Sequence, residues 1–317
     1  MRKCLTINRC TQNQTNTYYQ QVRLCQRKSV LKFHLISVIH FTQHFRINKF
    51  ECVTDGKVKL NKEDITLQEL EMDLPEVETG GRHSPKNCIA DERVAIIIPV
   101  REQDAHLRIL LRNLHPFLIR QQRDYRIYVM EQKQKDKFNK GKLFNVGFMY
   151  ALKDDYNCFV FHDVNWIPEE YSNVYKCGSQ PVQLSAESVA NSDHTLTVQQ
   201  ETHFEGVVAL TSDQFKTLNG YSNKCKNGGE NDDIFNRIKA SQMKVIRKPS
   251  KVGRFVVMGQ SQRKEAPLQL FNEFKSGINA LVYPLLGLHQ RDGLSNLEYE
   301  IIDFNEYKLY TRILTEV

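Results

Sequence analysis

Three short apolar runs, rich in β-branched and aromatic residues, alternate with two amphipathic segments between residues 94 and 161. Such runs predict strands that are buried on both faces of a parallel sheet. In the segments between them, apolar residues recur at helical spacing, and Asp104 is a candidate N-cap for the first helix. The predicted order is strand, helix, strand, helix and strand, at residues 94–99, 104–122, 126–130, 138–152 and 158–161. This order is typical of one half of a nucleotide-binding α/β sheet.

The third predicted strand ends in a polar cluster, His162-Asp163-Val164-Asn165, and Pro168 stops any regular continuation. In an open α/β sheet, ligands bind at the carboxyl ends of the strands. Asp163 and Asn165 would therefore offer oxygen atoms to a divalent metal or to the ribose of a sugar nucleotide. A simple turn is the alternative interpretation of the same residues. The chain has neither G-x-G-x-x-G after the first predicted strand nor G-x-x-x-x-G-K, so no dinucleotide or P-loop site is expected.

The chain beyond Pro168 adds further predicted elements. They are a strand at 204–210 that is approached through Gly206, a helix at 212–218, a turn at 219–220, a helix at 234–240, a strand at 243–247 and a turn at 251–254. The second of these helices follows two glycines and several acids. Carboxylates favour the positive end of a helix dipole, which is one explanation of this pattern. The other is that the loop brings Glu230 and Asp232 over a polar ligand.

The formal charge of +7 comes from one end of the chain. Residues 1–50 hold nine of the 44 Lys and Arg residues and no Asp or Glu, which leaves 35 basic against 37 acidic residues in the remainder. The basic character therefore belongs to a leader and not to a binding face on the fold, and no nucleic-acid partner is expected.

The leader has an apolar stretch at residues 30–41 that is too short and too polar to cross a membrane. It also lacks the pattern of a secretory signal. Residues 1–50 are expected to be a basic leader without regular structure, or alternatively a degenerate membrane anchor. Residues 51–93 are read as a stem that wraps onto the fold, and residues 94–317 as a single α/β domain.

Eight blocks of this sequence, in order and at similar spacing from about residue 79 to 303, resemble the metazoan β-1,4-galactosyltransferase family. The blocks are Val94-Ala-Ile-Ile-Ile-Pro-Val-Arg101, Leu114-His-Pro116, Phe138-Asn139, Leu143-Phe-Asn-Val-Gly147, the residues 158–168, Gly228-Gly-Glu230, Asp232-Asp-Ile-Phe-Asn-Arg237 and Asp292-Gly-Leu294. The resemblance implies a GT-A fold and residence in the Golgi as a type II membrane protein. It also implies inverting transfer of galactose or N-acetylgalactosamine from a UDP-sugar to a terminal N-acetylglucosamine of a glycan, with manganese as the metal.

The same resemblance implies two disulfides among the eight cysteines. It pairs Cys158 with Cys177, and it gives Cys88 an upstream partner, for which Cys52 is the candidate. Free buried thiols, which would suit a reducing compartment, are the alternative.

Several donor-binding residues are carried over from the family, some of them changed. In a turn that grips uracil and phosphate in the family, Arg101 is kept after Pro99, but a second arginine is replaced by Gln103. Lys140 replaces a family arginine and would still pair with phosphate, without the bidentate fork of a guanidinium. The donor-binding set implied by the resemblance is Pro99, Arg101, Phe138, Lys140, Asp163, Val164 and Gly206.

The implied manganese site is weakened. Asn165 stands where the family has a metal-binding aspartate, and Val257 and Gln260 stand where it has methionine and histidine. Asn165 and Gln260 could offer only neutral oxygens, which lack the charge that holds a hard cation. Weak manganese binding is therefore expected.

The acceptor and base region departs further from the family. Cys225 and Asn227 replace two tryptophans, and Asn231 replaces the aspartate that takes the acceptor proton, although an amide is not a base. Glu230 and Asp232 keep carboxylates that could orient acceptor hydroxyls. His203 stands at the position that, in the family, discriminates galactose from N-acetylgalactosamine as the donor sugar. Two functions follow: a hexosyltransferase with the catalytic set Asn231, Glu230 and Asp232, or a pseudoenzyme that keeps a UDP- or glycan-binding pocket.

Overall fold

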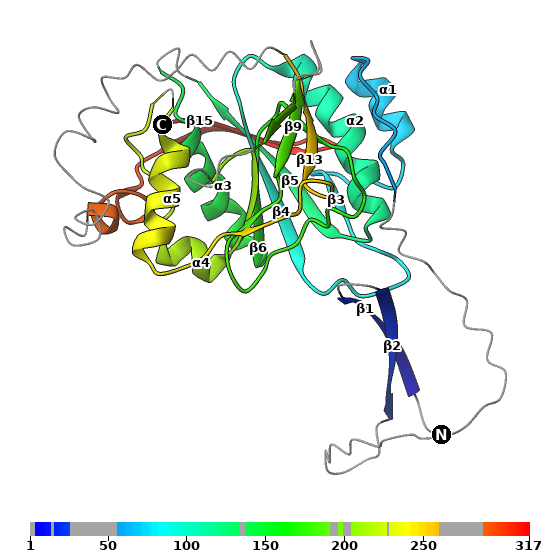
Figure 1. The fold of residues 1–317 in the computed structure, drawn as a ribbon. Helices are drawn as coiled ribbons and strands as arrows, with labels where there is room; N and C mark the ends of the chain where they lie inside the picture. The colour runs from blue at the N-terminus through cyan, green and yellow to red at the C-terminus, as the bar shows by residue number, and fades with distance from the viewer. Residues whose placement is uncertain are drawn as a thin grey trace.

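A central β-sheet with helices on both faces organises the chain (Figure 1). The computed structural model describes residues 4–13, 16–25, 56–133, 137–190, 196–198, 204–226, 228–259 and 288–317. Within these residues, the main sheet has nine strands in the order β12-β8-β11-β6-β4-β5-β15-β14, with β3 paired to β5 outside that path. The predicted α/β class is confirmed.

The predicted strand–helix–strand–helix–strand unit is present in full. β4 lies between β5 and β6 and runs parallel to both. Asp104 is the first residue of α2, and Gln103 is the N-cap, so the N-cap prediction was wrong by one residue. The unit consists of β4 (Arg93–Val100), α2 (Asp104–Arg120), β5 (Asp124–Gln132), α3 (Lys140–Lys153) and β6 (Cys158–His162).

Alternate residues of β4 face opposite sides of the sheet, as the two-residue period of a strand requires. Val94, Ile96 and Ile98 belong to a core shared with α1 (Leu67–Asp73) and α2. Ala95 and Ile97 belong to a second core, shared with α3, α4 (Ser212–Thr217) and α5 (Glu230–Ala240). Because both faces are covered, the strand is apolar throughout and does not alternate.

The sheet extends on both sides of this unit. On one side β11 (Val207–Thr211) is antiparallel to both β6 and β8 (Val182–Gln183), and β12 (Ile246–Arg247) is parallel to β8. The strand predicted at 243–247 is thus confirmed only in its last two residues. On the other side β15 (Thr311–Glu316) is parallel to β5 and forms a hairpin with β14 (Glu300–Glu306), which the sequence analysis did not predict.

A second sheet has the order β10-β9-β13-β7 within the described residues. Its strand β7 (Trp166–Pro168) follows β6 after the turn at Asp163 and is antiparallel to β13 (Arg254–Val257). The pairing of Val257 with Trp166 brings the end of β13 beside Asn165. The other members are β9 (Glu187–Ala190) and β10 (Leu196–Val198).

Residues 56–93 pack onto the sheet and contribute to its core. Thr66 caps α1 through a capping box with Glu69. Leu70 is fully buried in the core formed with α2, and Arg108 of α2 holds Asp64 by two hydrogen bonds of 2.7 and 2.6 Å. Further along, β3 (Arg82–His83) pairs with β5.

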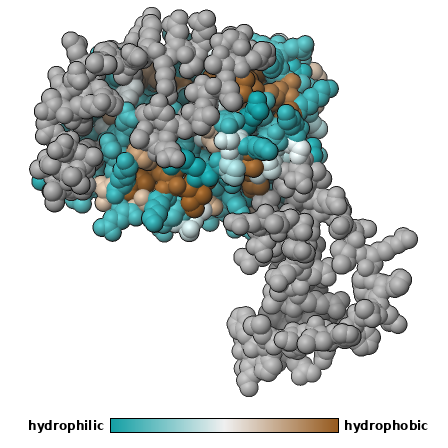
Figure 2. Space-filling model, in the orientation of Figure 1, coloured by the Kyte–Doolittle hydropathy of each residue, from teal (hydrophilic) through white to brown (hydrophobic). Residues whose placement is uncertain are grey.

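Near the N-terminus, β1 (Cys4–Asn13) and β2 (Asn16–Cys25) form an antiparallel hairpin, where the sequence analysis expected no regular structure. Among the described residues, no helix has the length and apolar character needed to cross a membrane. In the view of Figure 2 the described surface is mostly hydrophilic, with smaller apolar patches between the polar residues.

Candidate functional site

Four elements meet at the carboxyl end of β6. The backbone N–H of Asp163, just beyond β6, donates to the carbonyl of Gly206, which precedes β11, at 3.2 Å. The first turns of α3 and α5 also touch, since a Cβ at Gly141 would lie 3.5 Å from that of Glu230. Helix N-termini and strand ends therefore converge at the edge where an α/β sheet binds its ligand.

An ion pair between Lys140 and Asp163 lies at the centre of this convergence. Lys140 Nζ is 2.6 Å from Asp163 Oδ2, and the two side chains are only 18% and 20% exposed. Burial opposes both charges, but the Lys140 charge and hydrogen bond outweigh it and hold the pKa of Asp163 below its usual range. The charges of Asp163, Glu230 and Glu205 likewise outweigh burial at Lys140 and raise its pKa. Both partners are therefore charged at neutral pH.

The other predicted donor residues take up different positions. The Arg101 guanidinium lies over the Phe138 ring, 5.1 Å from its centroid, so these two predicted donor residues lie together. Pro99 is inside β4, opposite Met130 in the register. Val164 is 2% exposed and packs in the core beside α2, so its side chain does not face a ligand.

The oxygen that the sequence offers to a metal already has protein donors. Asn165 Oδ1 accepts from Gln103 Nε2 at 3.2 Å and is 2.7 Å from His106 Nδ1. The Asn165 backbone N–H donates to Asp163 Oδ1 at 2.9 Å, and Met258 donates its own N–H to the Asn165 carbonyl. Asn165 thus acts as a structural link between three segments.

The described residues do not fit a manganese ion at this position. Asp163 is neutralised by the Lys140 ammonium, Asn165 has no charge, and the Val257 side chain has no ligand atom. Gln260 and His203 lie outside the described residues, so the part assigned to each stays a prediction. Within the described ranges, the one group of three residues with metal-ligand side chains is Glu92, Cys158 and Cys177, but these two cysteines are joined in a disulfide and offer no thiolate.

His106 is a site residue that the sequence analysis missed. It lies in the first turn of α2, and it lines a small pocket of about 110 Å³ together with Lys62, Ile109, Ile167, Val256, Met258 and Gly259. A pocket for a small-molecule ligand usually has about 300 Å³ or more, so this one does not mark the donor site. The one sequence signal that could have pointed to His106 is its position, five residues after the predicted donor residue Arg101.

The acids at the start of α5 have different roles. Glu230 is 7% exposed and lies against the first turn of α3. Asn231 Nδ2 donates to Glu205 Oε2 at 3.3 Å. Asp233 instead pairs with Arg237 at 2.6 Å in the next turn of the helix. Glu230, Asp232 and Asp233 all lie in the first turn of α5, as the helix-dipole explanation expects, and the placement of Glu230 and Asp232 over a ligand stays a prediction.

Arg237 of α5 binds the segment around Asp292, and these contacts have a structural role. Arg237 is 1% exposed, and its Nη1 lies within 3.4 Å of five carbonyl oxygens, the nearest being that of Asp292 at 2.7 Å. Gly293 has a φ of +142°, and a Cβ there would lie 1.8 Å from the Asn219 carbonyl oxygen. These contacts give a structural reason for two blocks of the family resemblance, at residues 232–237 and 292–294.

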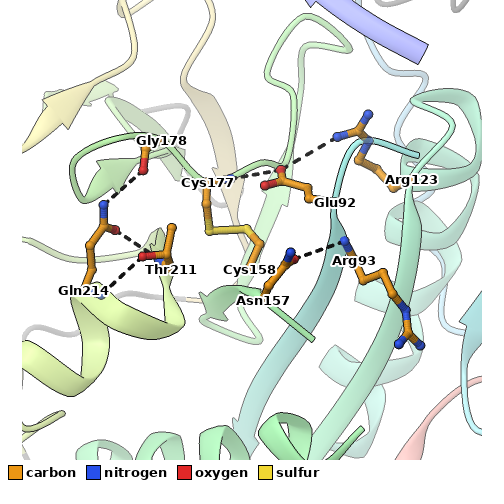
Figure 3. The surroundings of a disulfide bond; sticks show 9 residues. All are labelled: Glu92, Arg93, Arg123, Asn157, Cys158, Cys177, Gly178, Thr211 and Gln214. Atoms are coloured by element: carbon orange, nitrogen blue, oxygen red, sulfur yellow. Dashed lines mark hydrogen bonds and ion pairs between the residues drawn. A yellow bond between two sulfur atoms is a disulfide. The ribbon is translucent and has the colours of Figure 1, made fainter. Parts of the chain in front are cut away.

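The cysteines agree with part of the prediction. Cys158 and Cys177 form a disulfide with Cα atoms 5.5 Å apart, as Figure 3 shows. The Cys177 N–H donates to Glu92 Oε1 at 3.1 Å, and Arg123 lies near the same carboxylate (Figure 3). Cys88 is disulfide-bonded, and the predicted partner Cys52 lies outside the described residues. Cys225 is a free thiol, and burial raises its pKa to about 12.

Comparisons with known proteins support one assignment. Residues 26–178 match the family model described as the N-terminal region of glycosyl transferase group 7, and residues 187–261 match the N-terminal domain of galactosyltransferase. The chain is 41% identical over 257 residues to β-1,4-galactosyltransferase 1 of Mus musculus, covering 80% of this chain and 62% of that protein. It is 39% identical to β-1,4-galactosyltransferase 4 of Mus musculus, covering 80% of this chain and 72% of that protein.

A solved structure is also similar. The catalytic domain of Drosophila β-1,4-galactosyltransferase 7 in complex with xylobiose matches with a TM-score of 0.57 and 23% identity, over 71% of this chain and 94% of that one. A mutant of the same protein, in complex with manganese, UDP-Gal and xylobiose, matches equally well. The similarity confirms the predicted GT-A fold.

Proposed function

The chain belongs to the β-1,4-galactosyltransferase family, and we propose that it transfers galactose from UDP-galactose to a hydroxyl of a glycan, with inversion at the anomeric carbon. The observation that supports this most directly is the Lys140–Asp163 pair at the carboxyl end of β6. It places a cation and carboxylates together at the edge of the sheet where nucleotide sugars bind.

Arg101 and Lys140 hold the diphosphate in this proposal. Lys140 has three N–H donors and uses one on Asp163, so others are left for phosphate oxygens. Arg101 stacks on Phe138, which offers its ring to the uracil. Asp163 contacts the donor, and Glu230 orients acceptor hydroxyls from the start of α5.

The charge on the leaving diphosphate is offset by these two cations and not by tightly bound manganese. The support for this is the donor set around Asn165, whose oxygen is satisfied by Gln103 and His106. A metal at that position would have to displace both of these donors. We propose a terminal N-acetylglucosamine as the acceptor and the Golgi as the compartment, as the family resemblance implies.

A pseudoenzyme that binds UDP or a glycan is the second candidate. The observation that favours it is Asn231, an amide at the position where the family has its base. It differs from the first candidate in one respect only, which is turnover.

Transfer from labelled UDP-galactose and UDP-N-acetylgalactosamine to an N-acetylglucosamine acceptor tests both candidates. We expect galactose transfer by the full chain and its loss in Lys140→Met. The matched control is Lys153→Met, at the far end of the same helix, which should transfer like the parent. UDP binding without transfer of either sugar would favour the pseudoenzyme.

A further inference from the structure

Glu205 and Asn231 face each other across the site, although they are 26 residues apart. Asn231 Nδ2 donates to Glu205 Oε2 at 3.3 Å, between the first turn of α5 and the segment that leads into β11. The sequence pattern pointed to Glu230 and Asp232 as the carboxylates of this region. The fold adds a third, Glu205, beside the Asn231 amide.

The backbone at Glu205 is held on both sides. Ser185 Oγ donates to the Glu205 carbonyl at 2.7 Å. Gly206 has a φ of +81°, and a Cβ there would lie 2.6 Å from the same Ser185 Oγ and 3.0 Å from Trp166. The Gly206 carbonyl also accepts from Asp163. The backbone at Glu205 is therefore fixed relative to the end of β6, and the Asn231 amide holds the carboxylate.

The carboxylate also lies in the electrostatic field of the donor site. Glu205 is half-buried. Its charge is one of those that outweigh burial and raise the pKa of Lys140, together with Asp163 and Glu230. Glu205 thus belongs to the same charged cluster as the residues that we assign to the diphosphate.

We propose that Glu205 is the general base of the transfer and that Asn231 positions it. The inference rests on the proposed galactosyl transfer. The Glu205 carboxylate accepts the proton of the acceptor hydroxyl as that oxygen forms a bond to the anomeric carbon. The bond from this carbon to the β-phosphate oxygen breaks, and UDP leaves with the electron pair, stabilised by Lys140 and Arg101.

The amide at position 231 suits this arrangement better than an acid would. An amide N–H donates to a carboxylate oxygen, so Asn231 holds the Glu205 carboxylate in place. An aspartate in its place would set two like charges at hydrogen-bond distance, and their repulsion would raise the pKa of the pair. Asn231 and Glu205 therefore form a complementary pair.

The decisive variant is Glu205→Gln, which keeps the shape and removes the charge. We expect kcat for galactose transfer to fall about 10²- to 10⁴-fold, with UDP affinity and melting temperature unchanged. The acidic limb of the pH–rate profile should disappear with the carboxylate. Glu187→Gln, another half-buried carboxylate at the start of a strand, is the matched control and should behave like the parent.

Two further variants separate a base from a structural residue. Adding Asn231→Asp to Glu205→Gln moves the carboxylate to the partner side of the same hydrogen bond, so activity and the acidic limb should partly return. Asn231→Asp alone should shift the acidic limb to higher pH, and this test does not depend on whether Glu205→Gln folds.

The outcomes distinguish this inference from the function it rests on. Glu205→Gln with the parent's kcat and acidic limb would overturn the base assignment and leave galactosyl transfer standing. An acidic limb that does not move in Asn231→Asp would also overturn it. No transfer by the parent chain, with UDP bound, would instead remove the proposed function itself.

Discussion

Removing the cation at the centre of the site should destabilise the fold and weaken UDP binding together. In Lys140→Met, Asp163 loses a partner at 2.6 Å, and the carboxylates of Glu230 and Glu205 remain nearby. Breaking a fully buried ion pair costs about 3–5 kcal/mol, whereas an exposed pair is worth about 0–1 kcal/mol. Since about a fifth of each side chain is exposed, we expect a loss of about 2 kcal/mol.

A double-mutant cycle isolates this coupling. Asp163→Asn added to Lys140→Met removes the unpaired charge, so the double variant should be more stable than Lys140→Met alone. Urea unfolding of the parent, both single variants and the double variant gives the coupling energy. Isothermal titration with UDP should show about a 10- to 100-fold loss of affinity in Lys140→Met, the equivalent of about 1.4–2.8 kcal/mol.

Lys153→Met, at the other end of α3, is the control for removing a lysine from this helix. Additive single effects, with a coupling energy near zero, would show that the pair is solvated and does not organise the site. Unchanged UDP affinity in Lys140→Met would refute the assignment of Lys140 to the diphosphate.

Three further predictions concern stability and reactivity. Burial lowers the pKa of His115 and of His162 to about 4, so both stay neutral in the folded protein, while the unfolded chain binds protons near pH 6.5. Stability is therefore complete above pH 6.5 and should fall by up to about 3 kcal/mol per histidine between pH 6.5 and 4; a flat urea midpoint from pH 7.5 to 5 would contradict this. Cys177→Ser opens the disulfide and should lower the stability by about 3 kcal/mol in urea unfolding, and a stability equal to that of the parent would show that the bond constrains little. The Cys225 thiol, with its pKa near 12, should resist iodoacetamide at pH 7.5 in the folded protein and react on unfolding, as peptide mass spectrometry would show; rapid alkylation of the folded chain would mean that it is exposed.

The core strands of the fold could be predicted because their signal is local. β4, β5 and β6 are buried on both faces by packed helices. A strand in this environment needs apolar residues on both faces, so its sequence is a continuous apolar run. The edge strand β14 gives no such signal. Its residues alternate between half-buried and exposed, and it carries charges along its length, so its pattern resembles that of a loop.

The site could be predicted only where one segment supplies it. Asp163 and Lys140 were found because each lies at the end of a predicted element and matches a family position. His106 and Glu205 were missed because their importance comes from contacts made in the fold, with Asn165 and Asn231. A local sequence pattern does not predict that the Glu205 carboxylate will lie beside the Asn231 amide, 26 residues away.

Galactose transfer by the unmodified full chain, measured in EDTA and again with manganese, tests the central claim most directly. Labelled UDP-galactose and an N-acetylglucosamine acceptor are sufficient, and the product linkage can be read by NMR. We predict transfer at similar rates in both conditions, because Lys140 and Arg101 offset the diphosphate charge. Strict dependence on manganese would contradict the account of the metal position, and no transfer in either condition would contradict the assignment of activity.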